Sequence, residues 1–151
     1  MKRIFAVIAA CLIALCALSA ALAEAASLED VMASFDLAEE MMLLDDEDLT
    51  DVYGIDLADV RQFAAAIHDS GIKADEIVLV EAVDDEAAQR VQAILEERLE
   101  DKLNELDGYL PEEYAVAKAC AVEAEGCFVA MIVAPNADAL TELYRQAISA
   151  P

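Results

Sequence analysis

The chain has 151 residues, of which 32 are acidic and 9 are basic, so its formal net charge is −23. This length fits a single domain rather than two. A charge of this sign repels phosphate backbones and anionic membrane surfaces, and the sequence has no basic patch with interleaved aromatic residues. These features argue against nucleic-acid binding. The strong apolar runs argue against a disordered chain, because acidic chains stay unfolded when such runs are missing.

The N-terminus has the three parts of a bacterial secretory signal peptide. A basic Met1-Lys2-Arg3 start is followed by an uncharged apolar stretch, which ends in the small-x-small pattern Ala21-Leu22-Ala23. We predict a signal peptide over residues 1–23, with cleavage after Ala25 as the second choice. The single mature domain then covers residues 24–151 and lies outside the cytoplasm, either secreted or in the cell envelope.

Two alternatives stay open for this segment. Residues 4–22 are long enough to span a bilayer, so the leader would serve as an uncleaved anchor. Ile8-Ala9-Ala10-Cys11 matches a lipoprotein box by residue type, although little apolar sequence precedes the cysteine. Any contact with a membrane would come through one of these two anchors. The alanine content and the cleavage pattern favour removal of the leader.

The first part of the mature chain has helical signals. Residues 27–44 carry apolar side chains at the spacing of one or two helices. Ser27 is an acceptable N-terminal cap, and Asp36 offers a second one. A short helical turn over 49–53 is expected to end at Gly54, because glycine readily adopts the left-handed conformation of a C-cap.

The second half of the chain alternates strand and helix signals. The continuous β-branched run Ile77-Val78-Leu79-Val80 is typical of a buried strand. Apolar residues at helical spacing indicate a helix that ends at Gly108, with Pro111 beyond it. Glu125-Gly126 indicates a hairpin turn between two strands. We predict strands over 76–83, 114–124 and 127–134, and helices over 85–107 and 136–148.

Four short motifs then support a resemblance to a known family. They are L-x-x-V-Y-G-I-D at 49–56, A-D-E-I at 74–77, L-E-E-R-L at 95–99 and Y-L-P-E-E-Y at 109–114. In this order they resemble the bacterial family catalogued as domain of unknown function 4358, over about Leu28 to Ile148. Many members look like exported lipoproteins, whereas this chain has a small-x-small site where they have a lipobox cysteine. The family has no assigned catalytic or binding residue to carry over.

The resemblance also bears on one ambiguous segment. The consecutive alanines of residues 60–68 favour helix by propensity, but the resemblance implies a first strand there. We therefore expect a two-layer α+β domain. Its antiparallel sheet of about four strands carries helices 85–107 and 136–148 on one face, with N-terminal helices docked nearby. The alternative is a mainly helical N-terminal half over a smaller sheet.

No catalytic, cofactor-binding or metal-ligating residue is predicted. His68 is the one histidine of the chain, and a catalytic triad would need a nucleophile and an acid beside it. Ser70 is near in sequence but lies in an expected turn. Cys120 and Cys127 remain in the mature chain, where a disulfide is compatible with export. Two small core residues are the favoured interpretation of these thiols.

The acidic and methionine-rich segments have two interpretations each. The run Asp45–Asp51 invites a calcium site, but it lacks the Asp-x-Asp-x-Asp-Gly alternation and Leu49 interrupts it. A solvated acidic turn that caps a helix is favoured. Met32, Met41 and Met42 form either an adaptable docking stripe or part of the core, and the core is favoured.

The predicted function is that of a non-catalytic binding or interaction module outside the cytoplasm. Its partner is an envelope protein or a small ligand, and it uses no cofactor. The leader, the compact domain and the missing catalytic motif support this prediction. Two alternatives stay open: a binder of divalent cations or cationic peptides, which the acidic charge favours, and an enzyme that uses carboxylates outside any recognisable motif.

Overall fold

The computed structural model describes residues 27–149, so the predicted leader of residues 1–23 lies outside the described part of the chain. The strands are β1 (Met41–Leu43), β2 (Val60–His68), β3 (Glu76–Ala82), β4 (Val122–Glu125) and β5 (Phe128–Val133). The helices are α2 (Leu28–Ala33), α3 (Asp46–Tyr53), the 3-10 turn η2 (Leu57–Asp59), α4 (Asp85–Leu106), α5 (Pro111–Lys118) and α6 (Ala137–Ile148). The strands form one antiparallel sheet in the order β1-β2-β3-β5-β4. The α+β class and the antiparallel sheet are therefore confirmed.

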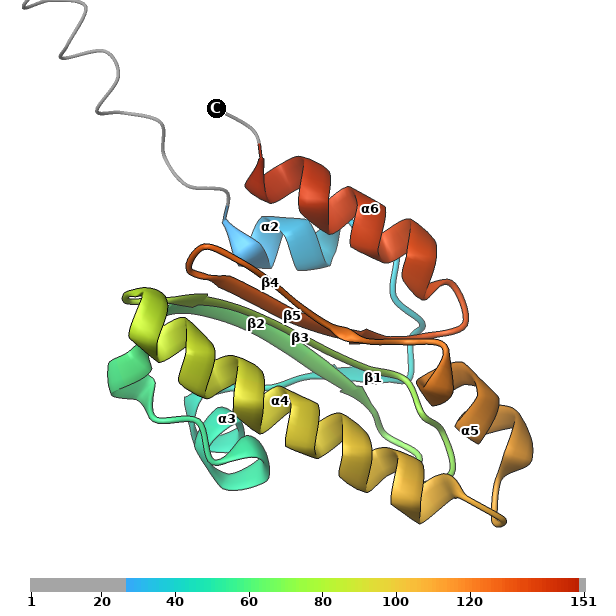
Figure 1. Cartoon of the computed structure of the whole chain (residues 1–151). Helices are drawn as coiled ribbons and strands as arrows, with labels where there is room; N and C mark the ends of the chain where they lie inside the picture. The colour runs from blue at the N-terminus through green and yellow to red at the C-terminus, as the bar shows by residue number, and fades with distance from the viewer. Residues whose placement is uncertain (1–26, 150–151) are drawn as a thin grey trace, which may run out of the picture.

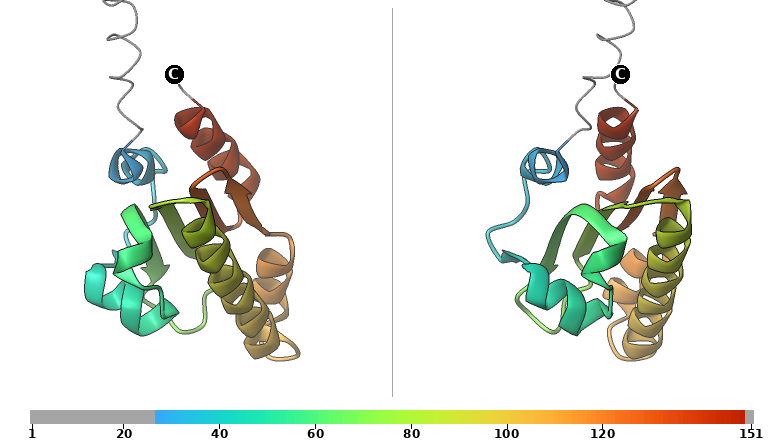
Figure 2. Two further views of the ribbon diagram at one scale, coloured as in Figure 1. Left: turned by 60° about the vertical axis from the view of Figure 1, so that its left-hand side comes forward. Right: turned by 90° about the vertical axis from the view of Figure 1, so that its left-hand side faces the viewer.

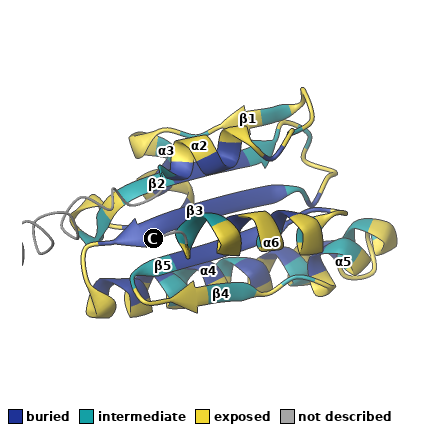
Figure 3. Cartoon of the chain, turned by 90° about the horizontal axis from the view of Figure 1, so that it is seen from above, coloured by how far each residue is buried: buried dark blue, intermediate teal, exposed yellow. Residues whose placement is uncertain are grey.

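Helices cover both faces of this sheet (Figure 1). β3 lies at its centre and is buried along its whole length, as Figure 3 shows. Val78 and Val80 share a core cluster with α3 and α4, whereas Ile77 and Leu79 share one with α2 and α6. The helices α4 and α6 thus lie on opposite faces, not on the single face predicted. The physical reason is that a strand with apolar residues on both sides needs a cover on each.

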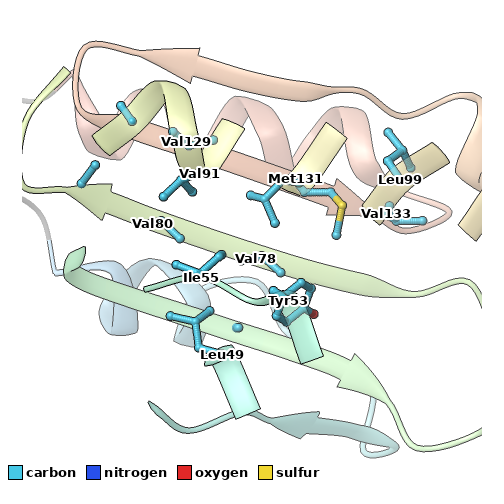
Figure 4. Packing of buried hydrophobic residues seen from close by; sticks show 14 of the residues in the cluster. Leu49, Tyr53, Ile55, Val78, Val80, Val91, Leu99, Val129, Met131 and Val133 are labelled. Carbon is cyan, nitrogen blue, oxygen red and sulfur yellow. The ribbon is translucent and has the colours of Figure 1, made fainter. Parts of the chain in front are cut away.

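The core between the sheet and α4 is the larger of the two clusters (Figure 4). Val91 and Leu95 of α4 are fully buried in it, together with Val80 and Met131 of the sheet. Leu49, also fully buried, brings α3 into the same cluster. The apolar stripe predicted for the long helix therefore forms the main contact between helix and sheet.

A strand replaces the second half of the helical region predicted over 27–44. α2 ends at Ala33, and Asp36 has a φ of 49°, a conformation that interrupts a helix. Residues Met41–Leu43 then pair with Ala66–His68 at the edge of the sheet. The apolar spacing alone did not distinguish the two structures, because the strand is only three residues long and depends on β2 for its hydrogen bonds.

A helix replaces the first half of the strand predicted over 114–124. Pro111 occupies the first turn of α5, where its fixed φ and missing N–H are favourable. Val122–Glu125 remain as β4 and pair with β5. The strand over 60–68, which the resemblance implied, is confirmed as β2.

Of the two N-terminal caps predicted by residue, Ser27 is confirmed and Asp36 is wrong, because Asp36 has a positive φ and the next element is the strand β1. The Ser27 Oγ accepts a hydrogen bond from the Asp30 N–H at 3.4 Å at the start of α2. Asp45 and Asp48 form a reciprocal capping box at the start of α3, so the acidic run does cap a helix. Gly54 ends α3 with a φ of 72°.

Candidate functional site

The candidate residues named from the sequence do not form a common site. His68 ends β2, where its Nδ1 accepts a hydrogen bond from the Ser70 N–H at 3.0 Å and lies 3.2 Å from an Asp69 carboxylate oxygen. Cys120 follows α5, Cys127 lies in the turn before β5, and both are free thiols. Burial raises the pKa of the Cys120 thiol, which disfavours the nucleophilic thiolate.

A buried ion cluster joins β3 to α4. Glu76 begins β3 and is completely buried. Its carboxylate accepts hydrogen bonds from the Arg98 Nε at 2.9 Å and Nη2 at 3.0 Å, and lies 2.8 Å from the Lys102 Nζ. The Arg98 guanidinium also lies 5.8 Å from the centre of the Tyr53 ring. Two cations from successive turns of α4 therefore neutralise one acid, beside the end of α3.

The electrostatics of the cluster keep Glu76 ionised. Burial on its own would raise the pKa of this carboxyl, but the Arg98 hydrogen bonds and the Lys102 charge outweigh it and hold the pKa below its usual value. Burial and the neighbouring Glu76 charge raise the pKa of the Tyr53 phenol far above its usual value. Tyr53 is thus neutral, and its hydroxyl is buried beside the Glu76 carboxylate.

The motifs behind the family resemblance converge on this cluster. Tyr53, Glu76 and Arg98 come from the first three motifs. Glu113, from the fourth, accepts a hydrogen bond from the Ala74 N–H at 2.9 Å. The four motifs therefore fasten α3, α4 and α5 to the start of β3. Because Glu76 is fully buried and both its oxygens are engaged, its carboxylate is not accessible to an external ligand.

An open groove, here called the edge groove, runs along β2 between α2 and the start of α3. Its volume is about 1030 Å³, and its lining includes Phe63, Ala64 and Ala65 of β2, Met32 of α2 and Leu44 after β1. Figure 2 shows α2 and α3 on either side of this edge of the sheet. A hollow of about 470 Å³ continues past Phe63 toward the start of β2. Grooves of this size accept ligand groups or peptide side chains.

Carboxylates surround the edge groove, and no described basic residue lines it. The acids come from α2, from the loop before β1 and from the start of α3, and all are exposed: Glu29, Glu39, Asp45, Asp46 and Glu47. None of them forms an ion pair with another described residue. Asp45 is engaged as a cap, which leaves the other four to face a ligand.

Two of the methionines named from the sequence, Met32 and Met41, contribute to the core and to the edge groove. Met32 is buried under α2, as the core interpretation predicts, yet it lines the groove together with Met41 and Leu43. Leu43 is 71% exposed and Met42 is 51% exposed. The sequence signal for this site was the apolar run beside the acids. The groove forms because part of β2 has no paired strand on this side within the described residues, and no sequence pattern predicted this.

The fold and the site define a single-sheet α+β domain with a buried carboxylate paired to two cations and an open, acid-lined edge groove. The family described as Domain of unknown function (DUF4358) matches residues 33–134, which include the ion cluster and most of the groove. The chain belongs to this family. No curated protein and no solved structure matches it.

Two further properties concern the described residues alone. Within residues 27–149, none of the helices combines the length and apolar character needed to cross a membrane. In the same part of the chain, no three His, Cys, Asp or Glu side chains are grouped so that they could hold a metal ion. The acidic run at 45–51 enters the fold as a helix cap and as one wall of the edge groove.

Proposed function

We propose that this protein is a non-catalytic binding module that works outside the cytoplasm and takes its partner in the edge groove. The observation that carries the proposal is the pairing of an apolar floor with exposed, unpaired carboxylates along a free strand edge. Binding sites combine apolar contact with a few polar groups in this way. The carboxylate at the centre of the ion cluster is buried and fully engaged, so the cluster is a less suitable site for a ligand. The proposed location rests on the leader sequence.

The experiment is site-specific photo-crosslinking in the cells that express the protein. One photoreactive side chain replaces Leu43, which is 71% exposed and lines the edge groove. The matched control replaces Tyr109, which is 70% exposed and lies in the turn between α4 and α5, outside the lining of the groove. Mass spectrometry identifies the adducts and the mature N-terminus in the same sample.

The outcomes separate the parts of the proposal. A dominant adduct from position 43 that is missing from position 109 supports binding in the edge groove. Equal adducts from both positions, or none from either, would contradict it. A mature N-terminus at Glu24 or Ala26 supports export through a cleaved leader, whereas a chain that starts at Met1 in the cytoplasmic fraction overturns the proposed location.

A further inference from the structure

We infer that the occupant of the edge groove is a short, extended, basic segment of a partner protein, which adds to the sheet as a strand beside β2. This inference rests on the proposed function, because it specifies the chemistry of the ligand at the same site. Addition of a strand to a free sheet edge is a general mode of peptide recognition, in which main-chain hydrogen bonds supply affinity and side-chain pockets supply specificity.

The free edge is the first step of the argument. β1 pairs with Ala66–His68, and the Leu44 N–H donates one more hydrogen bond to the Ala65 carbonyl at 2.9 Å. The chain then turns away at Asp45 into α3. Among residues 27–149, no strand pairs with Phe63 or Ala64 of β2 on this side. The part of β2 that lines the groove at Phe63 and Ala64 therefore has no paired strand within the described part of the chain.

The hydrogen-bonding groups of β2 are the second step. In an antiparallel sheet, alternate residues direct their N–H and C=O toward opposite neighbours. His68 donates to the Asp75 carbonyl on the β3 side, whereas Ala65 accepts on the β1 side. Phe63, two residues before Ala65, therefore directs its main-chain N–H and C=O toward the edge groove. A bulge at Arg61 changes the register just beyond it, so the site accepts a short segment only.

The charge of the groove selects the class of occupant. Glu29, Glu39, Asp46 and Glu47 are exposed and free of ion pairs within the described chain. They favour lysine or arginine on the guest and repel an acidic one. A second copy of this chain, with its net charge of −23, carries the wrong sign. An extended segment fits, because its side chains alternate between the two faces of the sheet, and each face offers apolar contacts and at least one acid, from α2 on one face and from the start of α3 on the other.

The other edge of the sheet is a shorter strand that carries an ion pair. β4 has four residues, and Glu123 pairs with Arg145 of α6 across it. Short, charged edge strands of this kind resist the addition of another chain. The edge beside β2 is therefore the better acceptor of an added strand in the described part of the chain.

The test uses the mature protein, labelled with nitrogen-15, and a capped peptide of sequence Lys-Val-Lys-Val-Lys. Amide NMR shifts give both the dissociation constant and the location of binding. We expect shifts at Phe63 and Leu44, slower hydrogen exchange of the Phe63 amide on binding, and no binding of the matching Glu-Val-Glu-Val-Glu peptide. Equal binding of both peptides, or shifts centred elsewhere, overturns the inference.

Two further comparisons test the charge and the strand geometry. The triple variant E29Q/E39Q/E47Q should weaken binding by about tenfold, as expected when three exposed charge pairs are lost. E97Q/E100Q/D101N changes the net charge equally on the exposed side of α4 and should leave binding within about twofold, since its charges are distant from the groove. Equal effects of the two triple variants would show that only net charge matters and would refute a specific site.

Strand addition can also be tested by modifying the peptide, which leaves the folding of the protein unchanged. Methylation of alternate amide nitrogens gives two peptides, one with the blocked groups toward β2 and one with them toward solvent. One should bind at least about tenfold more weakly than the other, because only one set of amides faces the host strand. Equal affinities overturn strand addition. A specific crosslink from position 43 would still support binding in the edge groove if neither the Lys-Val-Lys-Val-Lys peptide nor its methylated forms bind. That result would exclude a basic strand as the ligand.

Discussion

Replacing Glu76 by glutamine should destabilise the protein more than the loss of one surface charge pair. Glutamine keeps the shape of the side chain but removes the charge that neutralises Arg98 and Lys102. Lys102 is 7% exposed, so its ammonium would remain buried without a counter-charge. The Arg98 side chain, at 24% exposure, can shift part of its charge toward water. Removing one partner of a buried pair costs about 3–5 kcal/mol.

Thermal and urea unfolding of the chain without residues 1–23 measure this effect. For a domain of this size, 1 kcal/mol shifts Tm by roughly 3–5 °C, so we expect a fall of about 10–20 °C. The matched control is Asp59→Asn, which breaks the pair with exposed Arg90 and should change Tm little, because surface pairs contribute weakly. Adding Lys102→Met to the Glu76→Gln variant should restore part of the loss. A loss below about 1 kcal/mol for Glu76→Gln would refute the reasoning.

The same variant has a defined pH dependence. The pKa of Glu76 is lowered in the folded state, so its contribution is present above the unfolded value of about 4.3. It is lost as the pH falls through the lower folded value. The stability difference between wild type and Glu76→Gln should therefore be full at pH 7 and shrink below about pH 4. A difference that does not change with pH contradicts the assignment of Glu76 as an ionised, paired group.

Three further substitutions test other parts of the structure. Tyr144→Phe should leave Tm unchanged or raise it, because the buried hydroxyl has no hydrogen-bond partner among the described residues; a clear fall would reveal a missing partner. Gly54→Ala should cost about 1–2 kcal/mol, since Gly54 has a φ of 72°, whereas Gly71→Ala should be nearly neutral in the same urea titration. Leu43→Asp should keep Tm, because Leu43 is largely exposed, but should reduce binding of the Lys-Val-Lys-Val-Lys peptide measured by NMR.

Local signals in the sequence were enough to predict most of the elements. The apolar stripe of α4, the cap at Asp45 and the stop at Gly54 depend on neighbours within a few residues, and each appears where expected. The start of α5 also had a local signal, Pro111, which the β-like residues after it obscured. Where propensity and pattern disagreed, as in the alanine-rich β2, the family resemblance decided correctly.

Long-range contacts account for what the sequence could not predict. Met41–Leu43 become a strand because β2 offers them hydrogen bonds, and no short-range pattern encodes that pairing. The partners of Glu76 are 22 and more residues away in the chain. A clue was present in Arg98 and Lys102, which are four residues apart and so share one face of a helix. The acid opposite them was identifiable only from the structure.

The carboxylates that would attract a basic segment to the edge groove also disfavour self-association of the protein. A free strand edge with exposed apolar neighbours such as Leu43 is a general route to self-association. Two copies that met through β2 would bring the carboxylates of both grooves together, including Glu29 and Glu47 of each copy. Like charges at close range oppose that contact, whereas lysine or arginine on a foreign strand relieves the repulsion within the rim. One set of acids thus excludes the second copy and favours the proposed partner, so the open edge can persist without being covered.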